Sequence, residues 1–258
     1  MAETDVHWKP MLVGGAAGLV AETLVFPIST IITRVQSSVP FYQTGGFKHL
    51  YRGLSSVLVS TLPSTSSFFF VYEYAKQKQQ PGTRNHLVSA SVAEFFSCGI
   101  LAPAEAIRQR AQTSRLSLPN IIFTFFHSRK DVWQSFKGMA IRNVPATAFQ
   151  FVLYENFKSK FTASDKLFGA PKGAALSGAI TAALLTPLDV IKTQINLQPD
   201  DYKTTIRRIY QLHGAFGFFK GLTLRVFAAS LGLSIYLGTY EYFKSHFRIK
   251  RLRDARFE

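Results

Sequence analysis

The sequence is poor in charged residues and in cysteine. Charged residues make up 17% of its 258 positions, against about 25% in soluble domains of average composition. The single cysteine, Cys98, excludes a disulfide framework within the chain and is expected to be a small buried residue. The sequence has no metal-ligand spacing, glycine-rich phosphate loop or nucleophile triad. We therefore expect neither an enzyme nor a metal-binding protein.

The charge that the chain does carry is mainly positive. Its formal net charge is +15, which suits nucleic acid, an anionic lipid surface or an anionic substrate as a partner. The cations are spread over every segment between the apolar stretches instead of forming one stripe, so we expect no nucleic-acid binding. Residues 1–10 include Glu3, Asp5 and Lys9 before any apolar run, and they resemble neither a signal peptide nor an arginine-rich transit peptide.

Apolar stretches predict an all-α membrane protein with six transmembrane helices. Each stretch is near or above the ~20 residues that cross a bilayer. None is apolar on every side, and the mean hydropathy of the chain is only +0.09, so each helix should turn one face to lipid and another to water or its neighbours. Amphipathic stretches near 119–129 and 202–213 should lie at one membrane face. The six spans lie near 11–36, 54–76, 86–112, 139–158, 171–196 and 223–244.

One pattern recurs three times at a spacing of roughly 80 residues, which indicates three copies of one structural unit. Each copy has a proline inside its first apolar stretch, where it should kink the helix. Each also has an aromatic-base-glycine motif that closes its central loop, here called the closure. Each copy ends in an aromatic residue followed by an acid, here called the aromatic-acid ending. The prolines are Pro27, Pro103 and Pro187, and the closing glycines are Gly53, Gly138 and Gly221. The predicted copies cover about 8–80, 85–162 and 168–248 of a single domain, 1–258.

These motifs resemble the mitochondrial carrier family over nearly the whole chain, from about Leu12 to Lys244. The run from Pro103 to Gln112 is a complete match to the family's proline motif, and the run from Pro187 to Lys192 is nearly so. The resemblance implies three pseudo-symmetric two-helix repeats around a central cavity, with short amphipathic helices on the matrix side. It further implies a monomer of the mitochondrial inner membrane that works by alternating access, with the membrane lipid cardiolipin bound at helix N-termini near the three closures.

The three aromatic-acid endings predict a gate on the cytoplasmic side. Each acid stands three residues before a lysine, so the two could simply pair within one helix. In a threefold bundle each acid could instead reach the lysine of the next helix, and the resemblance implies such a ring. Its members are Glu73 and Lys76, Glu155 and Lys158, and Glu241 and Lys244.

The proline turns predict a second gate, on the matrix side, that is incomplete. Ser29 stands where the family pattern has an acid, and Ile32 stands where it has a base. Arg108 and Asp189 are therefore expected to lack partners, so that two of three ionic bridges are missing. A weak matrix gate follows.

Other parts of the matrix gate are retained. Glu105 and Lys192 are expected to form the remaining bridge. Gln36 and Gln112 resemble the glutamines that brace this ring in the family, and the shorter Asn196 takes that place in the third repeat.

Three ionisable residues inside the predicted spans indicate a substrate site. Glu22, Glu94 and Arg142 are each flanked by small or apolar residues, and charges at such positions are functional more often than not because burying them is costly. The alternative is a fixed salt bridge between Arg142 and one of the two acids, serving packing alone. We expect the cavity acids to outnumber its cations, which argues against a nucleotide phosphate as substrate.

Within the family, the narrower resemblance is to its S-adenosylmethionine carriers. The run from Gly45 to Gly53, with its very short first matrix segment, and the run from Arg142 to Pro145 carry it. In such a site the two acids would attract the cationic centres, and Arg142 would hold the carboxylate. Asn143 and Gln150 could hydrogen-bond the adenine, while Phe68 and Tyr236 could contact the sulfonium.

The expected function is exchange of S-adenosylmethionine for S-adenosylhomocysteine, without covalent chemistry. Leu101 stands where these carriers have arginine, and Asn143 stands where they have an acid. These departures leave open another adenine compound, a basic amino acid or a metal ion as cargo. Ser29, Ile32 and Gln194, which replaces a common arginine, leave open a carrier-like scaffold that does not transport. The three intact endings argue against that scaffold.

Overall fold

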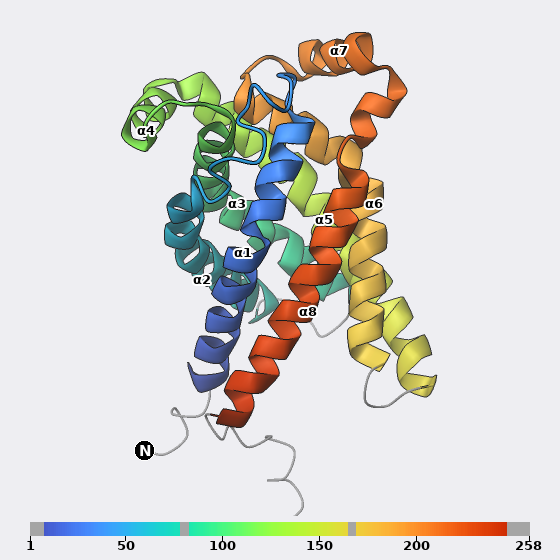
Figure 1. Cartoon of the computed structure of the whole chain (residues 1–258). Helices are drawn as coiled ribbons and strands as arrows, with labels where there is room; N and C mark the ends of the chain where they lie inside the picture. The colour runs from blue at the N-terminus through green and yellow to red at the C-terminus, as the bar shows by residue number, and fades with distance from the viewer. Residues whose placement is uncertain (1–7, 78–82, 165–168, 247–258) are drawn as a thin grey trace, which may run out of the picture.

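The computed structural model describes residues 8–77, 83–164 and 169–246, and within these ranges it contains helices and no strand (Figure 1). Six long helices build a bundle, and shorter helical segments connect some of them. The long helices are α1 (Trp8–Gln36), α2 (Leu54–Gln77), α3 (Thr83–Thr113), α5 (Arg129–Ser164), α6 (Gly169–Leu197) and α8 (Leu222–His246). The short ones are α4 (Leu118–His127), α7 (Tyr202–His213) and the 3-10 helix η1 (Ala215–Phe219).

The six long helices form a closed ring. Neighbours pack in the order α1, α2, α3, α5, α6, α8, and α8 closes the ring by packing along α1, beside which it runs in Figure 1. α1, α3 and α6 also contact one another across the centre. These three helices carry the internal prolines Pro27, Pro103 and Pro187. The prediction of an all-α bundle of three two-helix repeats is confirmed.

The two amphipathic helices lie where the sequence predicts them and share one end of the bundle, hereafter the α4/α7 end (Figure 1). α4 buries Ile121 and Phe125, whereas Phe123 and Phe126 on its other side are exposed. α7 buries Thr205 and Ile209. The ends of α1, α3 and α6 that follow the prolines are joined by hydrogen bonds at this same end, so it is the closed end of the ring.

The first repeat has no amphipathic helix and uses a buried arginine instead. Arg34, 2% exposed, donates from Nη1 to the carbonyl oxygens of Gly46 and Lys48, the second at 2.8 Å. The segment 37–53 is thereby folded against the end of α1. Gly45 has a φ of +111°, and a Cβ there would lie 3.1 Å from Arg34 Nη2, so this turn needs glycine both for its backbone and for its space.

One prediction of loop structure is wrong. The second aromatic-base-glycine motif does not close a loop, because α5 begins at Arg129 and runs straight through Gly138. Gly53 and Gly221 do turn the chain, with φ values of +86° and +79°. Ser128 Oγ donates to Asp131 Oδ1 at 2.6 Å and accepts from the Asp131 backbone N–H at 3.3 Å, so the helix already has its N-terminal turn ten residues before Gly138.

Length and composition alone mark four of the described segments as able to cross a membrane: Gly15–Gln36, Leu54–Gln77, Leu87–Thr113 and Ala215–Tyr236. α5 and α6 are as long, with 36 and 29 residues. Both carry charged residues that face the centre of the bundle, as described next, where these residues do not meet lipid.

Candidate functional site

Two adjoining cavities occupy the centre of the bundle. The larger, of about 620 Å³, lies between α1, α5, α6 and α8. The smaller, of about 360 Å³, also reaches α2 and α3 and extends to the α4/α7 end. Their shared wall contains Glu22, Ile32, Arg142 and Arg225. Three of these four residues are charged, so the centre of the bundle is a polar site that small solutes can enter.

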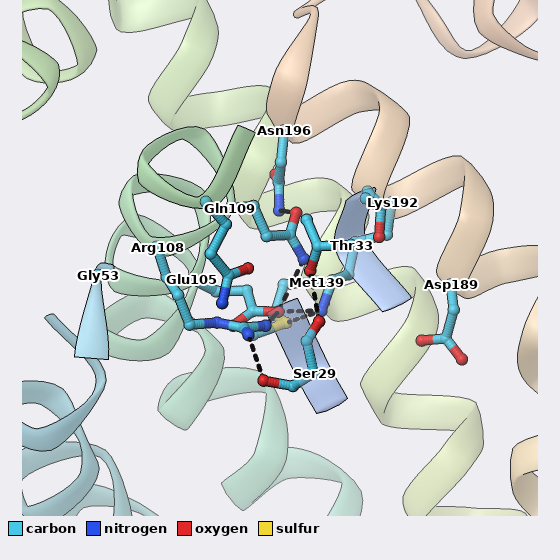
Figure 2. A network of polar contacts seen from close by, with 12 residues as sticks. Ser29, Thr33, Gly53, Glu105, Arg108, Gln109, Met139, Asp189, Lys192 and Asn196 are labelled. Atoms are coloured by element: carbon cyan, nitrogen blue, oxygen red, sulfur yellow. Dashed lines mark hydrogen bonds and ion pairs between the residues drawn. The ribbon is translucent and has the colours of Figure 1, made fainter. Parts of the chain in front are cut away.

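Glu105 organises the first charged cluster, which Figure 2 shows. Its carboxylate accepts two bonds from Arg108, at 2.6 and 2.8 Å, and one from Gln109 Nε2 at 2.8 Å. Lys192 Nζ of α6 reaches the same carboxylate at 3.2 Å and joins α3 to α6. Arg108 also donates from Nη1 to Ser29 Oγ at 3.3 Å. The expectation that Arg108 lacks a partner is therefore wrong: it pairs within its own helix and reaches the serine that replaces the acid.

Asp189 lies apart from that cluster in Figure 2 and has partners of its own. Arg142 Nε of α5 lies 2.7 Å from its Oδ1, and Arg225 Nη2 of α8 lies 2.8 Å from its Oδ2. The Asp189 side chain is only 3% exposed. The expectation that Asp189 is unpaired is wrong, because two arginines from other helices take the place of the missing base at Ile32.

Arg142 is linked onward to Glu94. Its Nη1 donates to Asn143 Oδ1 at 3.1 Å, and Asn143 Nδ2 donates to Glu94 Oε1 at 2.8 Å. A polar chain thus runs from Glu94 through Asn143, Arg142 and Asp189 to Arg225. The fixed salt bridge of Arg142 with Glu22 or Glu94, the structural alternative considered above, does not form in the described residues.

The other residues predicted for substrate binding are placed unevenly. Glu22 lines both cavities and, within the described ranges, makes no ion pair or hydrogen bond. Tyr236 lines the larger cavity. Phe68 lines neither; it stacks on Tyr72 with ring centroids 6.1 Å apart. The Gln150 side chain lies outside the described residues. Glu22, Arg142, Asn143 and Tyr236 therefore line the two adjoining cavities, and Glu94 is joined to them through Asn143.

The α4/α7 end is closed by a ring of three equivalent hydrogen bonds between repeats. Arg34 Nε donates to the Gln112 carbonyl at 2.8 Å, and Arg110 Nε donates to the Asn196 carbonyl at 2.7 Å. Gln194 Nε2 completes the circle by donating to the Gln36 carbonyl at 2.6 Å. Each donor stands seven residues after its proline. The Gln194 amide thus donates to a carbonyl of the neighbouring repeat, as the two arginines do in the other repeats.

The three brace residues, Gln36, Gln112 and Asn196, join the same pairs of repeats through their side chains. Gln36 Oε1 accepts from Thr193 Oγ1 at 2.9 Å, Gln112 Nε2 donates to Thr30 Oγ1 at 2.9 Å, and Asn196 Nδ2 donates to Gln109 Oε1 at 3.0 Å. All three braces are at most 2% exposed. Each pair of repeats is therefore joined at this end by buried hydrogen bonds, whether or not an ionic bridge is present.

The opposite gate remains a prediction. Glu73 and Lys76 lie on exposed positions near the end of α2, and Lys76 Nζ lies 5.8 Å from the Tyr72 ring centroid. The side chains of the other four members, Glu155, Lys158, Glu241 and Lys244, lie outside the described residues.

His213, at the end of α7, contacts Lys220. Lys220 Nζ lies 2.7 Å from His213 Nε2. Loss of water contact, and then the charge of Lys220, lower the pKa of His213. At neutral pH the imidazole is therefore uncharged and accepts the bond from the ammonium.

Arg225 is the functional candidate that the sequence reasoning left without a role. A signal for it exists: Arg142 and Arg225 each stand four residues after a motif glycine, Gly138 and Gly221. Val57 occupies the same place in the first repeat. Comparing the repeats position by position would have placed both arginines at one level of the bundle.

The sequence can now be compared with known proteins. The family model described as "Mitochondrial carrier protein" matches residues 3–83, 79–165 and 168–251. The chain is 73% identical over 255 residues to an uncharacterized mitochondrial carrier of Schizosaccharomyces pombe, covering 99% of both chains. It is 34% identical to the mitochondrial S-adenosylmethionine carrier protein of Xenopus tropicalis, covering 90% of this chain and 93% of the relative. It is 33% identical to the S-adenosylmethionine mitochondrial carrier protein homolog of Drosophila melanogaster, covering 90% of each.

Three matches of one family model span nearly the whole chain, and the fold and the threefold closure agree with it. The chain therefore belongs to the mitochondrial carrier family, as a multi-pass transporter of small molecules in the mitochondrial inner membrane.

Proposed function

We propose that the protein imports S-adenosylmethionine into mitochondria in exchange for S-adenosylhomocysteine. One observation carries the proposal: the central cavity holds a free carboxylate, Glu22, together with the two arginines Arg142 and Arg225. A cargo with a cationic end and a carboxylate would find complementary groups for both. S-adenosylmethionine has a sulfonium and an ammonium group at one end and a carboxylate beside them. The names of the relatives in frog and fly support the same cargo.

The charge balance of the site corrects one expectation but still disfavours a nucleotide phosphate. The acids do not outnumber the cations: Glu22, Glu94, Glu105 and Asp189 face the four bases Arg108, Arg142, Lys192 and Arg225. All four bases are engaged by Glu105 or Asp189. A cargo bearing several negative charges would leave those acids with too few cations, whereas a cargo close to neutral keeps the balance.

A basic amino acid is the second candidate, and Asn143 favours it. Both polar atoms of this amide are used, one by Glu94 and the other by Arg142. Asn143 therefore keeps only one N–H and one oxygen lone pair for the adenine that the sequence predicts it to bind. A basic amino acid needs the same acid and arginine contacts and no adenine site.

Competition in liposomes separates the two cargoes. The purified protein would be reconstituted, and uptake of labelled S-adenosylmethionine measured against an excess of unlabelled S-adenosylhomocysteine, lysine, arginine or ATP. We expect S-adenosylhomocysteine to compete and ATP to have no effect. Competition by lysine or arginine in its place would support the second candidate.

Two variants connect the result to the site. Glu22→Gln should reduce uptake at least about tenfold, because it removes the free carboxylate that meets the cationic end. Asp200→Asn is the control: its partner Arg208 lies 2.7 Å away on the α7 side, outside the cavity, and loss of that surface pair should change uptake little. Equal uptake by Glu22→Gln and the control would contradict the proposed site.

A further inference from the structure

We propose that Arg142, Asp189 and Arg225 form a latch on the matrix gate, and that the carboxylate of the cargo opens it by taking both arginines from Asp189. This inference rests on the proposed function and assigns a role to Arg225, which positions the gate acid and then contacts the cargo. It also assigns different roles to the charged groups of the cargo: the sulfonium and ammonium groups bind, and the carboxylate permits movement.

The latch stands in for an ionic bridge that the first repeat cannot make. Asp189 is the gate acid of the third repeat, and Ile32 holds the position of the base that would pair with it from α1. Lys192, the gate base of the third repeat, is engaged by Glu105 at 3.2 Å. Arg225 comes from α8, which packs against α1, and Arg142 comes from α5, which packs against α6. The two arginines therefore tie the gate acid to helices on both sides of it.

The cargo can reach the arginines but not the acid behind them. Arg142 and Arg225 line both cavities, with side chains 22% and 23% exposed. Asp189 lines only the smaller cavity, and its side chain is 3% exposed. A carboxylate in the larger cavity would thus meet the guanidinium groups first.

The geometry also makes Arg225 available for exchange of partners. Its Nη2 is at ion-pair distance from Asp189 Oδ2, yet that oxygen accepts no well-aligned hydrogen bond and the Nε of Arg225 is buried without a partner. A buried donor without an acceptor is costly. A cargo carboxylate that accepts from this Nε would satisfy it, while Asp189 keeps no other ion pair in the described part of the chain. An acid left without a cation favours hydration from the matrix side, and hence opening of that side.

The experiment uses the decarboxylated analogue of S-adenosylmethionine, which retains the sulfonium, the amine and the adenine. In the wild-type protein the analogue should compete with labelled S-adenosylmethionine but should not enter liposomes itself, because it cannot release Asp189. If the carboxylate were only a binding contact, the analogue would instead bind weakly and enter at a comparable maximal rate when saturating.

A charge-balanced double variant, Asp189→Asn with Arg225→Gln, tests the same idea in reverse. It removes the latch without changing net charge, so the analogue should now enter at a rate within about threefold of S-adenosylmethionine, because movement no longer depends on the carboxylate. Asp200→Asn should behave like the wild type, carrying S-adenosylmethionine and excluding the analogue.

The two ways of failing are distinguishable. Wild-type protein that carries both compounds at similar maximal rates would overturn the latch and leave the proposed function standing. A double variant that carries S-adenosylmethionine and still excludes the analogue would also overturn the latch. Folded wild-type protein that carries neither compound would overturn the proposed function, and the latch with it.

Discussion

Replacing Glu105 by glutamine should destabilise the protein more than any other single charge removal at the α4/α7 end. Glu105 holds two buried cations, Arg108 and Lys192, whose side chains are only 11% and 10% exposed. The amide can still accept hydrogen bonds but no longer neutralises either cation. The variant therefore leaves Arg108 and Lys192 without an ion-pair partner in the described part of the chain.

The magnitude follows from the burial of the pair. Removing one partner of a buried ion pair costs about 3–5 kcal/mol, and we take the lower end, about 3 kcal/mol, because the adjoining cavity can admit water. For a chain of this size, 1 kcal/mol lowers the melting temperature by about 2–4 °C. Glu105→Gln should therefore lower it by roughly 6–12 °C. Thermal unfolding of purified protein in mild detergent measures the shift.

Asp200→Asn is the comparison, since it removes an acid from an ion pair whose carboxylate is 43% exposed. An exposed pair contributes about 0–1 kcal/mol, so this melting temperature should fall by no more than roughly 4 °C. Equal shifts for the two variants would refute the reasoning, because they would mean that the Glu105 cluster does not hold the closed end together.

Two further predictions concern the same end of the bundle. Gln194→Leu removes the 2.6 Å bond to the Gln36 carbonyl and should lower the free energy of unfolding by about 1–3 kcal/mol. Gln194→Arg should stay within about 1 kcal/mol of wild type, because it restores the donor used in the other repeats. Equal stabilities of the two variants in urea unfolding would contradict this prediction. Gly45→Ala should lower the unfolding free energy by roughly 1–3 kcal/mol, because φ is +111° and a Cβ would lie 3.1 Å from Arg34. Gly99→Ala is its control, since a Cβ there meets nothing within 4 Å, and it should unfold like wild type.

The spans and the threefold order could be predicted from the sequence because they depend on local patterns. Apolar length predicts α1, α2, α3, α6 and α8 to within a few residues at most ends. Repetition of the proline motif predicts which helices meet at the α4/α7 end. The start of α5 could not be predicted, because the motif that ends at Gly138 has the same aromatic-base-glycine pattern as the two that turn the chain. Only the cap at Ser128 shows that the helix has already begun.

The pairing inside the cavity was harder to predict, for a physical reason. The ring pattern shows which charges are missing at Ser29 and Ile32, but a buried Asp189 accepts any cation that can reach it. Whether Arg142 and Arg225 reach Asp189 depends on how the helices of different repeats pack, which is not a local property of the chain. The same holds for Gln194, because its 2.6 Å bond to the Gln36 carbonyl depends on how α6 packs against α1.

Exchange in liposomes tests the central claim most directly. Protein reconstituted in liposomes would be offered labelled S-adenosylmethionine outside, with or without S-adenosylhomocysteine inside. We predict that internal S-adenosylhomocysteine stimulates uptake and that Glu22→Gln abolishes the stimulation. Absence of uptake by wild-type protein whose melting transition shows it to be folded would contradict the account.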